Sequence, residues 1–147
     1  MLSAFWYAKG VIKTDFTPGI IDSHYYCALV SDVRKLRWKP RNQDLYLLHD
    51  NAPVHTAHRT VDAIAEKGFV LVSHPPYSPD LAPSDFFLFN HSKKHLRGQR
   101  IESKEDLTRL VQDFLNEKDA TFFKNGLFSL VNRWTKCLEA EGGYIEK

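Results

Sequence analysis

Two aspartates stand where a carboxylate could do chemistry. Asp50 comes two residues after the apolar run Leu45–Leu48, which is short enough to be a buried strand. Ligands of open α/β sheets bind outside the carboxyl ends of the strands, so an acid at such an end is a candidate site residue. Asp85 comes after a gap of 34 residues and opens the apolar stretch Phe86–Phe89, which predicts the start of a helix. These two acids are the candidate site.

The segment between the two acids predicts a strand, helix and strand in succession. From Thr56 to Lys67 the apolar residues recur at helical spacing, and Gly68 stands where a helix commonly ends. The apolar positions are Ala57, Val61, Ile64 and Ala65. The run Phe69–Val72 then predicts a strand that lies parallel to Leu45–Leu48, joined to it by a right-handed crossover. This arrangement would bring Asp50 and Asp85 to the same edge of the sheet.

The N-terminal residues predict a hairpin and a helix. Strands are expected over 1–7 and 11–16, with a tight turn at 8–10 in which Gly10 supplies a positive φ. Ser23 is the expected N-cap of a helix that runs to about Lys35. Its apolar stripe consists of Tyr26, Leu29, Val30 and Val33. We expect this stripe to be core.

The last third of the chain predicts two helices. Ser103–Asp106 resembles a capping box, and an apolar stripe at helical spacing follows it. That stripe consists of Leu107, Leu110, Val111, Phe114 and Leu115. A second helix is expected to begin near Asp119. Its apolar side chains, all predicted to be core, are Phe122, Phe123, Leu127, Leu130, Val131, Trp134 and Leu138.

The composition is that of one ordinary domain. The chain has 147 residues, 43% of them hydrophobic, and a net charge of +2, so a nucleic-acid surface has to come from local clusters. Cys27 and Cys137 lack the spacing of a zinc knuckle or a disulfide framework and are expected to be reduced core thiols. No apolar stretch approaches the ~20 residues of a membrane span, and no signal peptide is recognisable. We expect an intracellular protein that does not contact membranes.

Two blocks of sequence carry a resemblance to a known family. They are His49–His55, which reads HDNAPVH, and Pro75–Asp85, which reads PPYSPDLAPSD. With the gap of 34 residues between the acids, they closely resemble the catalytic domain of mariner-type transposases of the Tc1/mariner superfamily. Taken singly, an aspartate at a strand end is usually a turn former or helix cap, and a proline-rich loop is usually a rigid connection. Two blocks in this order at this separation favour the family.

The resemblance implies a ribonuclease-H-like α/β fold, a mixed sheet flanked by helices. Residues 1–101 would be the core and 102–147 the C-terminal helices. In the family, the first strand and the N-terminal helix-turn-helix DNA-binding domain precede the segment that matches residues 1–16. We therefore expect a partial catalytic domain that lacks both. Without the first strand its neighbours would present unpaired edges.

The resemblance also implies a two-metal site for Mg²⁺ or Mn²⁺. Such ions activate the nucleophile and stabilise the leaving oxygen of a phosphodiester, and they prefer oxygen ligands. Asp50 and Asp85 match the second and third of the family's three catalytic aspartates, each helping to hold one metal. No acid of this chain matches the first. His49, Asn51 and His55 flank the site, where a histidine more often orients a carboxylate than ligates Mg²⁺.

Double-stranded DNA, in the form of transposon ends and target, is the partner that the family implies. The best local basic cluster consists of Lys93, Lys94, Arg97 and Arg100. It would suit a DNA backbone path, but a solvated helix face explains it about as well. A homodimer and a nuclear location are further implications of the family for the intact protein.

The function expected is metal-dependent DNA cleavage and strand transfer, with the chain inactive when it is alone. Whether the chain is an enzyme therefore stays open. A first alternative is a non-catalytic DNA-binding or dimerisation module derived from a transposase. A second is another metal nuclease of the same fold, such as a ribonuclease H or a resolvase, which the block Pro75–Asp85 fits poorly.

Overall fold

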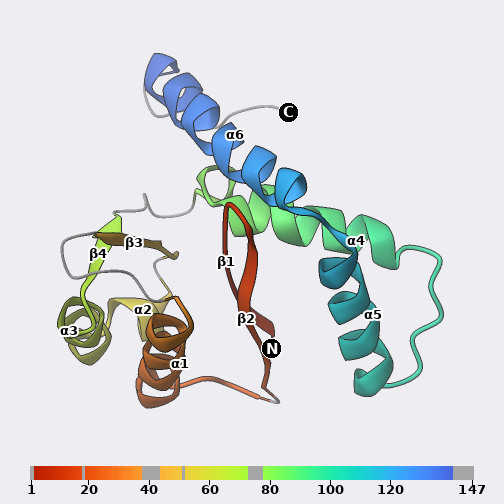
Figure 1. The fold of residues 1–147 in the computed structure, drawn as a ribbon, viewed down its shortest axis with the longest axis horizontal. Helices are drawn as coiled ribbons and strands as arrows, with labels where there is room; N and C mark the ends of the chain where they lie inside the picture. Colours follow the sequence, from red (N-terminus) through yellow and green to blue (C-terminus); the bar gives the residue numbers. More distant parts are fainter. Residues whose placement is uncertain (1, 18, 38–43, 51, 73–77, 141–147) are drawn as a thin grey trace. The chain divides into compact units, whose positions relative to one another are not determined.

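The computed structural model describes residues 2–17, 19–37, 44–50, 52–72 and 78–140 (Figure 1). The chain divides into two compact units, each of which takes part of the N-terminal hairpin. The first unit is Met1–Phe5 with Ile12–Ser78, and the second is Trp6–Val11 with Pro79–Lys147. Each unit is described by itself. Asn51 and residues 75–77 of the proline-rich block lie outside the described residues.

The hairpin has the predicted form. Strands β1 (Leu2–Tyr7) and β2 (Gly10–Phe16) make a two-stranded sheet. Gly10 has a φ of 146°, a value that L side chains rarely adopt, so the expected turn glycine is confirmed.

Helix α1 (Ser23–Leu36) supplies much of the core of the first unit. Its N-cap is Asp22 and not Ser23, because the Asp22 carboxylate accepts the backbone N–H of Tyr25 at 2.8 Å. The predicted stripe is confirmed as buried. Its members Tyr26, Val30 and Val33 form one core cluster with Leu45, Ile64 and Phe69, against which Phe5, Ile12 and Leu47 also pack.

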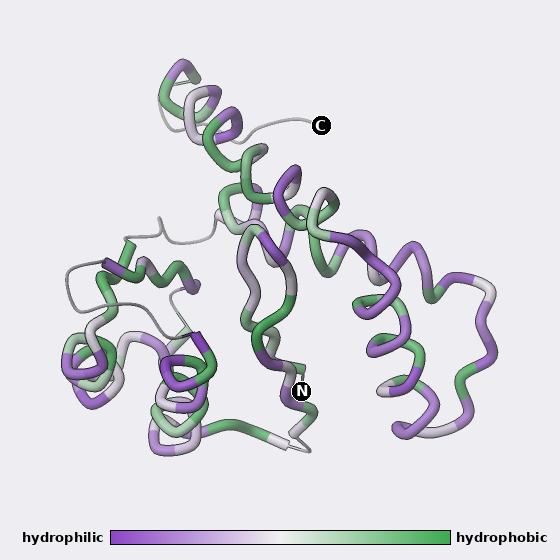
Figure 2. Tube along the Cα trace, viewed as in Figure 1, coloured by the Kyte–Doolittle hydropathy of each residue, from purple (hydrophilic) through white to green (hydrophobic). Residues whose placement is uncertain are grey.

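Strands β3 (Leu45–Leu48) and β4 (Phe69–Val72) pair in parallel, as the sequence predicted, with Leu45 opposite Phe69. Both are largely apolar along their length (Figure 2). Two helices connect them, the single turn α2 (Pro53–Thr56) and α3 (His58–Glu66). Gly68, at a φ of 82°, ends α3 where the sequence placed a C-terminal glycine.

The buried face of α3 differs from the predicted one. Thr60 and Ile64 are buried, whereas Val61 and Ala65 are exposed. The expected helix over 56–67 is broken after Thr56 and begins again at His58. Within α3 the packing of the unit, and not the apolar pattern, decides that the face with Thr60 and Ile64 lies inward. Thr60 tolerates full burial because its hydroxyl donates to the carbonyl of Val54.

The second unit is helical in its described C-terminal part. A 3₁₀ turn, η1 (Pro79–Leu81), leads into a π-helical segment, η2 (Ser84–Phe89), which continues as α4 (Asn90–Leu96). The π-helical geometry was not predicted. Helices α5 (Lys104–Glu117) and α6 (Ala120–Glu139) follow.

Both late helices begin where the sequence predicted, α5 at the expected cap Ser103 and α6 directly after Asp119, which is its N-cap. Ser103 accepts the N–H of Asp106 and Asp119 accepts that of Phe122, each at 3.1 Å. The reciprocal half of the capping box is displaced by one residue, because Asp106 accepts the N–H of Glu102.

An aromatic cluster forms the core of the second unit. Phe87 lies 4.7 Å from Phe122 between ring centroids, and Trp6 at the hairpin tip lies 5.9 Å from Phe123. Trp6 also donates its indole N–H to the hydroxyl of Ser84 at 3.0 Å. Buried Gly126 brings the backbone of α6 close to the ring of Phe87.

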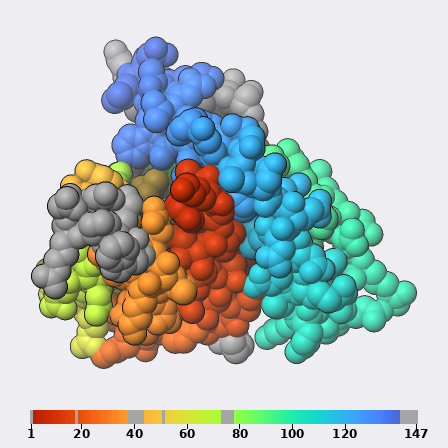
Figure 3. Space-filling model, in the orientation of Figure 1, coloured from red at the N-terminus to blue at the C-terminus, as the bar shows by residue number. Residues whose placement is uncertain are grey.

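The C-terminal half of α6 is less buried than its pattern predicted. Val131 and Leu138 are 69% and 79% exposed, so their assignment to the core was wrong. The space-filling view shows this half of the helix at the surface (Figure 3). Trp134 is half-buried and donates its indole N–H to the carbonyl of Leu81 at 3.2 Å. Within the described residues no helix has the length and apolar character needed to cross a bilayer.

The replacement Gly126→Ala tests the contact between α6 and Phe87. A Cβ at this position would have three ring atoms of Phe87 within 2.9 Å. Glycine to alanine inside a helix ordinarily stabilises by about 1 kcal/mol. Here we expect a loss of about 1–3 kcal/mol in the free energy of unfolding, because the overlap must be relieved by moving packed groups. Denaturant unfolding measures the change.

The matched control is Asn125→Ala, at an exposed position of the same helix. It should change the free energy of unfolding by no more than about 0.5 kcal/mol. A stabilised Gly126→Ala protein would contradict the close approach.

Candidate active site

Asp50 lies two residues beyond the last residue of β3, at the carboxyl end of the strand, and its side chain is 54% exposed. Its Oδ1 atom accepts the backbone N–H of Ala52 at 3.1 Å and lies 2.7 Å from Nδ1 of His55. The first contact closes a turn ahead of α2, as expected of an aspartate that forms a turn. The turn fixes the carboxylate while leaving it accessible to solvent.

Three rings lie behind this carboxylate. The ring of His55 stacks on that of His49 with centroids 4.6 Å apart and planes 6° apart. Tyr26 of α1 lies 4.3 Å from the His55 ring, and its hydroxyl is 2.7 Å from Nδ1 of His49. Helix α1, the end of β3 and helix α2 each contribute one ring, and the tertiary fold brings them together.

Tyr26 is the most buried member of this cluster, at 3% exposure. Burial raises the pKa of its phenol well above the ordinary value of 10.0, and the charges of Asp50 and Cys27 add to the shift. The phenol therefore keeps its proton at neutral pH. The sequence identified Tyr26 only as core. A hydroxyl within an apolar stripe was the available signal, because a buried phenol needs a hydrogen-bond partner.

Asp85 is exposed and belongs to the second unit. It is the second residue of η2, and its backbone N–H donates to the carbonyl of Ala82 at 2.9 Å. The chain reaches it through the 3₁₀ turn η1, whose Leu81 is buried together with Ala82. The carboxylate thus sits at the start of a helical segment that is anchored by apolar packing on both sides.

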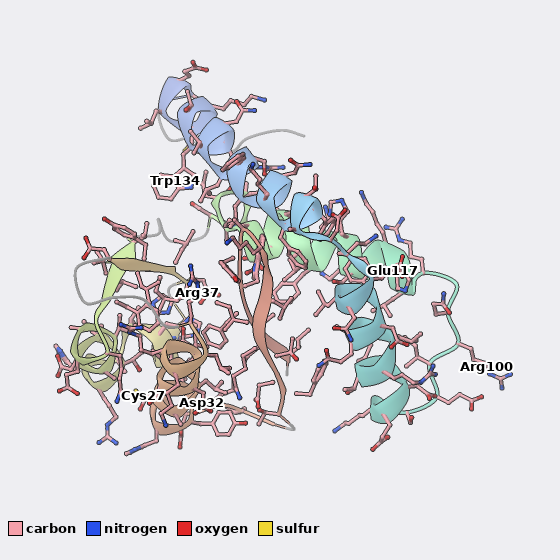
Figure 4. The ribbon with its side chains drawn as sticks, in the orientation of Figure 1. Cys27, Asp32, Arg37, Arg100, Glu117 and Trp134 are labelled. Atoms are coloured by element: carbon pink, nitrogen blue, oxygen red, sulfur yellow. The ribbon has the colours of Figure 1, made fainter. Side chains whose placement is uncertain are left out.

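The basic cluster lies around the end of α4. Lys93 and Lys94 are exposed in its last turn, and Arg97 is its C-cap. Arg100 follows in the connection to α5 and extends away from the ribbon (Figure 4). Its guanidinium makes an exposed ion pair of 2.7 Å with Glu102, which solvent screens. Cations that are solvated in this way remain available to a phosphate backbone.

The donor chemistry of the two aspartates suits a hard divalent cation. Each supplies an exposed carboxylate, the ligand type that Mg²⁺ and Mn²⁺ prefer. His55 is engaged with Asp50 and so has the position of a residue that orients a ligand. In the part of the chain that the structure describes, no group of three or more His, Cys, Asp or Glu side chains is placed to hold a metal.

Comparison with known proteins identifies the family. The family model for the DDE superfamily endonuclease matches residues 3–108. The mariner Mos1 transposase of Drosophila mauritiana is 32% identical over 154 residues, covering 99% of this chain and 45% of the relative. The histone-lysine N-methyltransferase SETMAR of Homo sapiens is 31% identical over 153 residues, covering 99% of this chain and 22% of the relative.

A solved structure agrees with these matches. The crystal structure of the catalytic domain of Mos1 mariner transposase matches with a TM-score of 0.91 and 33% identity, over 99% of this chain and 75% of that one. The chain belongs to the DDE superfamily of endonucleases and, within it, to the mariner type. The expected ribonuclease-H-like α/β fold is therefore confirmed. The chain spans less than half the length of the curated relatives it matches.

The shifted pKa of Tyr26 predicts how stability depends on alkaline pH. The folded state holds the phenol protonated, so its contribution to stability is complete below the ordinary pKa of 10.0. That contribution should be lost as the pH rises above 10.0, because the unfolded chain releases the proton first. We expect the free energy of unfolding to fall less steeply above this pH in Tyr26→Phe than in the parent chain. Equal slopes in the two proteins would contradict the burial of an un-ionised phenol.

Proposed function

We propose that this chain belongs to the catalytic domain of a mariner-type DNA transposase. Such an enzyme cleaves DNA strands and transfers them in a metal-dependent reaction. The observation that carries the proposal is the match of nearly the whole chain, at 33% identity, to the Mos1 catalytic domain. The exposed Asp50 and Asp85, each set by local hydrogen bonds at the start of a helical segment, support it.

Asp50 and Asp85 are the proposed catalytic residues, each donating a carboxylate to Mg²⁺ or Mn²⁺. Structures of the Mos1 catalytic domain with Mn and with Mg support this choice of metals. Bound divalent ions would activate the attacking oxygen and neutralise charge on the phosphate. The residues of this chain would hold the ions, with His55 contacting Oδ1 of Asp50 and Tyr26 supporting the two histidines from the core. A role for Asn51 stays a prediction.

DNA is the proposed partner, and Mos1 paired-end complexes that include a transposon end support it. The exposed cations Lys93, Lys94, Arg97 and Arg100 would contact its backbone without reading sequence. A homodimer on transposon ends and a nuclear location complete the proposal. The division of the chain at residue 101 stays a prediction.

Two variants test the metal ligands. In a ¹⁵N-labelled chain titrated with Mn²⁺, we expect paramagnetic broadening of amides around Asp50 and around Asp85. Asp50→Asn should weaken the first effect about tenfold or more, and Asp85→Asn the second, because an amide is a poorer ligand than a carboxylate. The matched controls are Asp62→Asn in the first unit and Asp113→Asn in the second, both at exposed helical positions. Unchanged broadening in the two test variants would contradict the assignment.

Plasmid nicking tests activity directly. The sequence predicts that residues 1–147 are inactive alone, so supercoiled DNA should stay intact with Mn²⁺. Nicking that disappears in Asp50→Asn would contradict that expectation and would make the chain an enzyme as it stands.

The basic cluster yields a separate prediction, which also bears on the alternative of a non-catalytic DNA-binding module. Lys93→Gln with Lys94→Gln should weaken duplex binding equally for all sequences and lower the salt slope by about 2. Lys9→Gln with Lys136→Gln, at exposed positions outside the cluster, is the control with the same loss of charge. An equal loss in both pairs would mean a diffuse effect of net charge. Salt-dependent binding without Mn²⁺-dependent cleavage would favour the non-catalytic module.

A further inference from the structure

The contacts behind Asp50 bear on where the hydrogens of the two stacked histidines lie. Nδ1 of His55 faces two acceptors, Oδ1 of Asp50 at 2.7 Å and the Asp50 carbonyl oxygen at 3.2 Å. Neither atom can donate while the carboxylate is ionised. Nδ1 of His55 must therefore carry a hydrogen and donate it to Asp50.

The partner of His49 is a hydroxyl. Its Nδ1 lies 2.7 Å from the hydroxyl of Tyr26, whose phenol keeps its proton because burial raises its pKa. A phenol that keeps its proton can donate it to Nδ1, and in that arrangement the ring hydrogen of His49 is on Nε2. The two parallel imidazoles, 4.6 Å apart, then hold opposite tautomers.

We propose that Tyr26 is a positioning residue for Asp50: its buried hydroxyl fixes the ring and tautomer of His49, on which His55 stacks as it donates to the carboxylate. This inference rests on the proposed function, in which Asp50 binds a metal. It adds a residue from α1 to a site otherwise built from the segment that follows β3.

Burial along this chain of contacts follows the order that positioning requires. Tyr26 is 3% exposed, the His55 side chain 19% and the Asp50 side chain 54%. The most buried group therefore contacts the next, and the carboxylate at the end remains accessible. An orientation fixed before the metal arrives spares the entropy of ordering the ligand, as partners behind metal ligands commonly do.

Packing alone does not account for Tyr26. A phenylalanine would fill the same volume beside Phe5 and the core without burying a hydroxyl, which costs free energy unless it is hydrogen-bonded. The hydroxyl has its partner in His49. Tyr26→Phe thus removes the proposed function of the side chain and keeps its shape.

The matched control is Tyr25→Phe on the same helix. The Tyr25 hydroxyl donates to the Asp15 carboxylate at 2.8 Å and accepts from the Thr17 hydroxyl at 2.9 Å, and it lies outside the ring stack. Each variant loses one phenol oxygen, and Tyr25→Phe loses two hydrogen bonds. An effect on the ring stack that appears in Tyr26→Phe alone therefore reports the contact with His49.

The first measurement uses the metal-free chain. Long-range ¹H–¹⁵N spectra, assigned with His49→Gln and His55→Gln, should show a hydrogen on Nε2 of His49 and on Nδ1 of His55. Tyr26→Phe should shift the His49 ring signals and the Ala52 amide, which donates to Asp50, whereas Tyr25→Phe should leave both unchanged. A hydrogen on Nδ1 of His49, or identical spectra in the two variants, would overturn the inference.

The second measurement is Mn²⁺ affinity, followed by broadening of the Ala52 amide. Tyr26→Phe should weaken the Mn²⁺ affinity about fivefold, the loss expected when one hydrogen bond is removed. His55→Ala should weaken it about tenfold, whereas His55→Asn, whose amide can donate from the position of Nδ1, should restore most of the loss. The two His55 variants also provide the test if Tyr26→Phe does not fold. Equal affinities of the Ala and Asn variants would overturn the inference.

The two proposals can fail separately. A parent chain that binds no Mn²⁺ would contradict the proposed metal role of Asp50. The tautomers and the Ala52 amide, measured without metal, would still decide whether Tyr26 positions the carboxylate.

Discussion

The burial of one phenol joins the core of the first unit to its accessible carboxylate. Tyr26 belongs to the cluster that holds α1 against β3, α3 and β4, and its hydroxyl reaches His49 at the end of β3. A polar group in that position is tolerable only because its partner lies in the right place. The hydrogen bond therefore ties the packing of α1 to the geometry of the segment that carries Asp50.

The second unit positions its aspartate by aromatic packing together with hydrogen bonds to the backbone of η1. Asp85 precedes an aromatic cluster in which Phe87 meets Phe122, and the buried Gly126 lets α6 approach that ring closely. Trp134 and Arg133 of α6 donate to carbonyls of η1, just before Asp85. Close-packed aromatic groups leave few alternative arrangements, so the start of η2 is fixed from both sides.

Membership of the DDE superfamily favours a metal-binding role for Asp50 and Asp85, but each aspartate also has an ordinary structural role. Asp50 closes the turn before α2, and Asp85 begins a helical segment. The two readings are compatible, because a turn that holds a carboxylate at a strand end also presents it to a ligand. The basic residues around the end of α4 are equally compatible with a solvated surface and with a phosphate backbone.

The sequence by itself determined most of the elements, and its motifs determined the family. Alternating and helical patterns located the hairpin, the parallel pair, α1 with its buried stripe, the cap at Ser103 and the start of α6, because these depend on local backbone and side-chain preferences. Only the tertiary structure decided which faces of α3 and of the end of α6 are buried. It placed Thr60 inside and Leu138 outside, and it joined Tyr26 to His49 across 23 residues. Burial and hydrogen bonding between distant segments depend on what packs against each face, and periodicity within one segment does not carry that information.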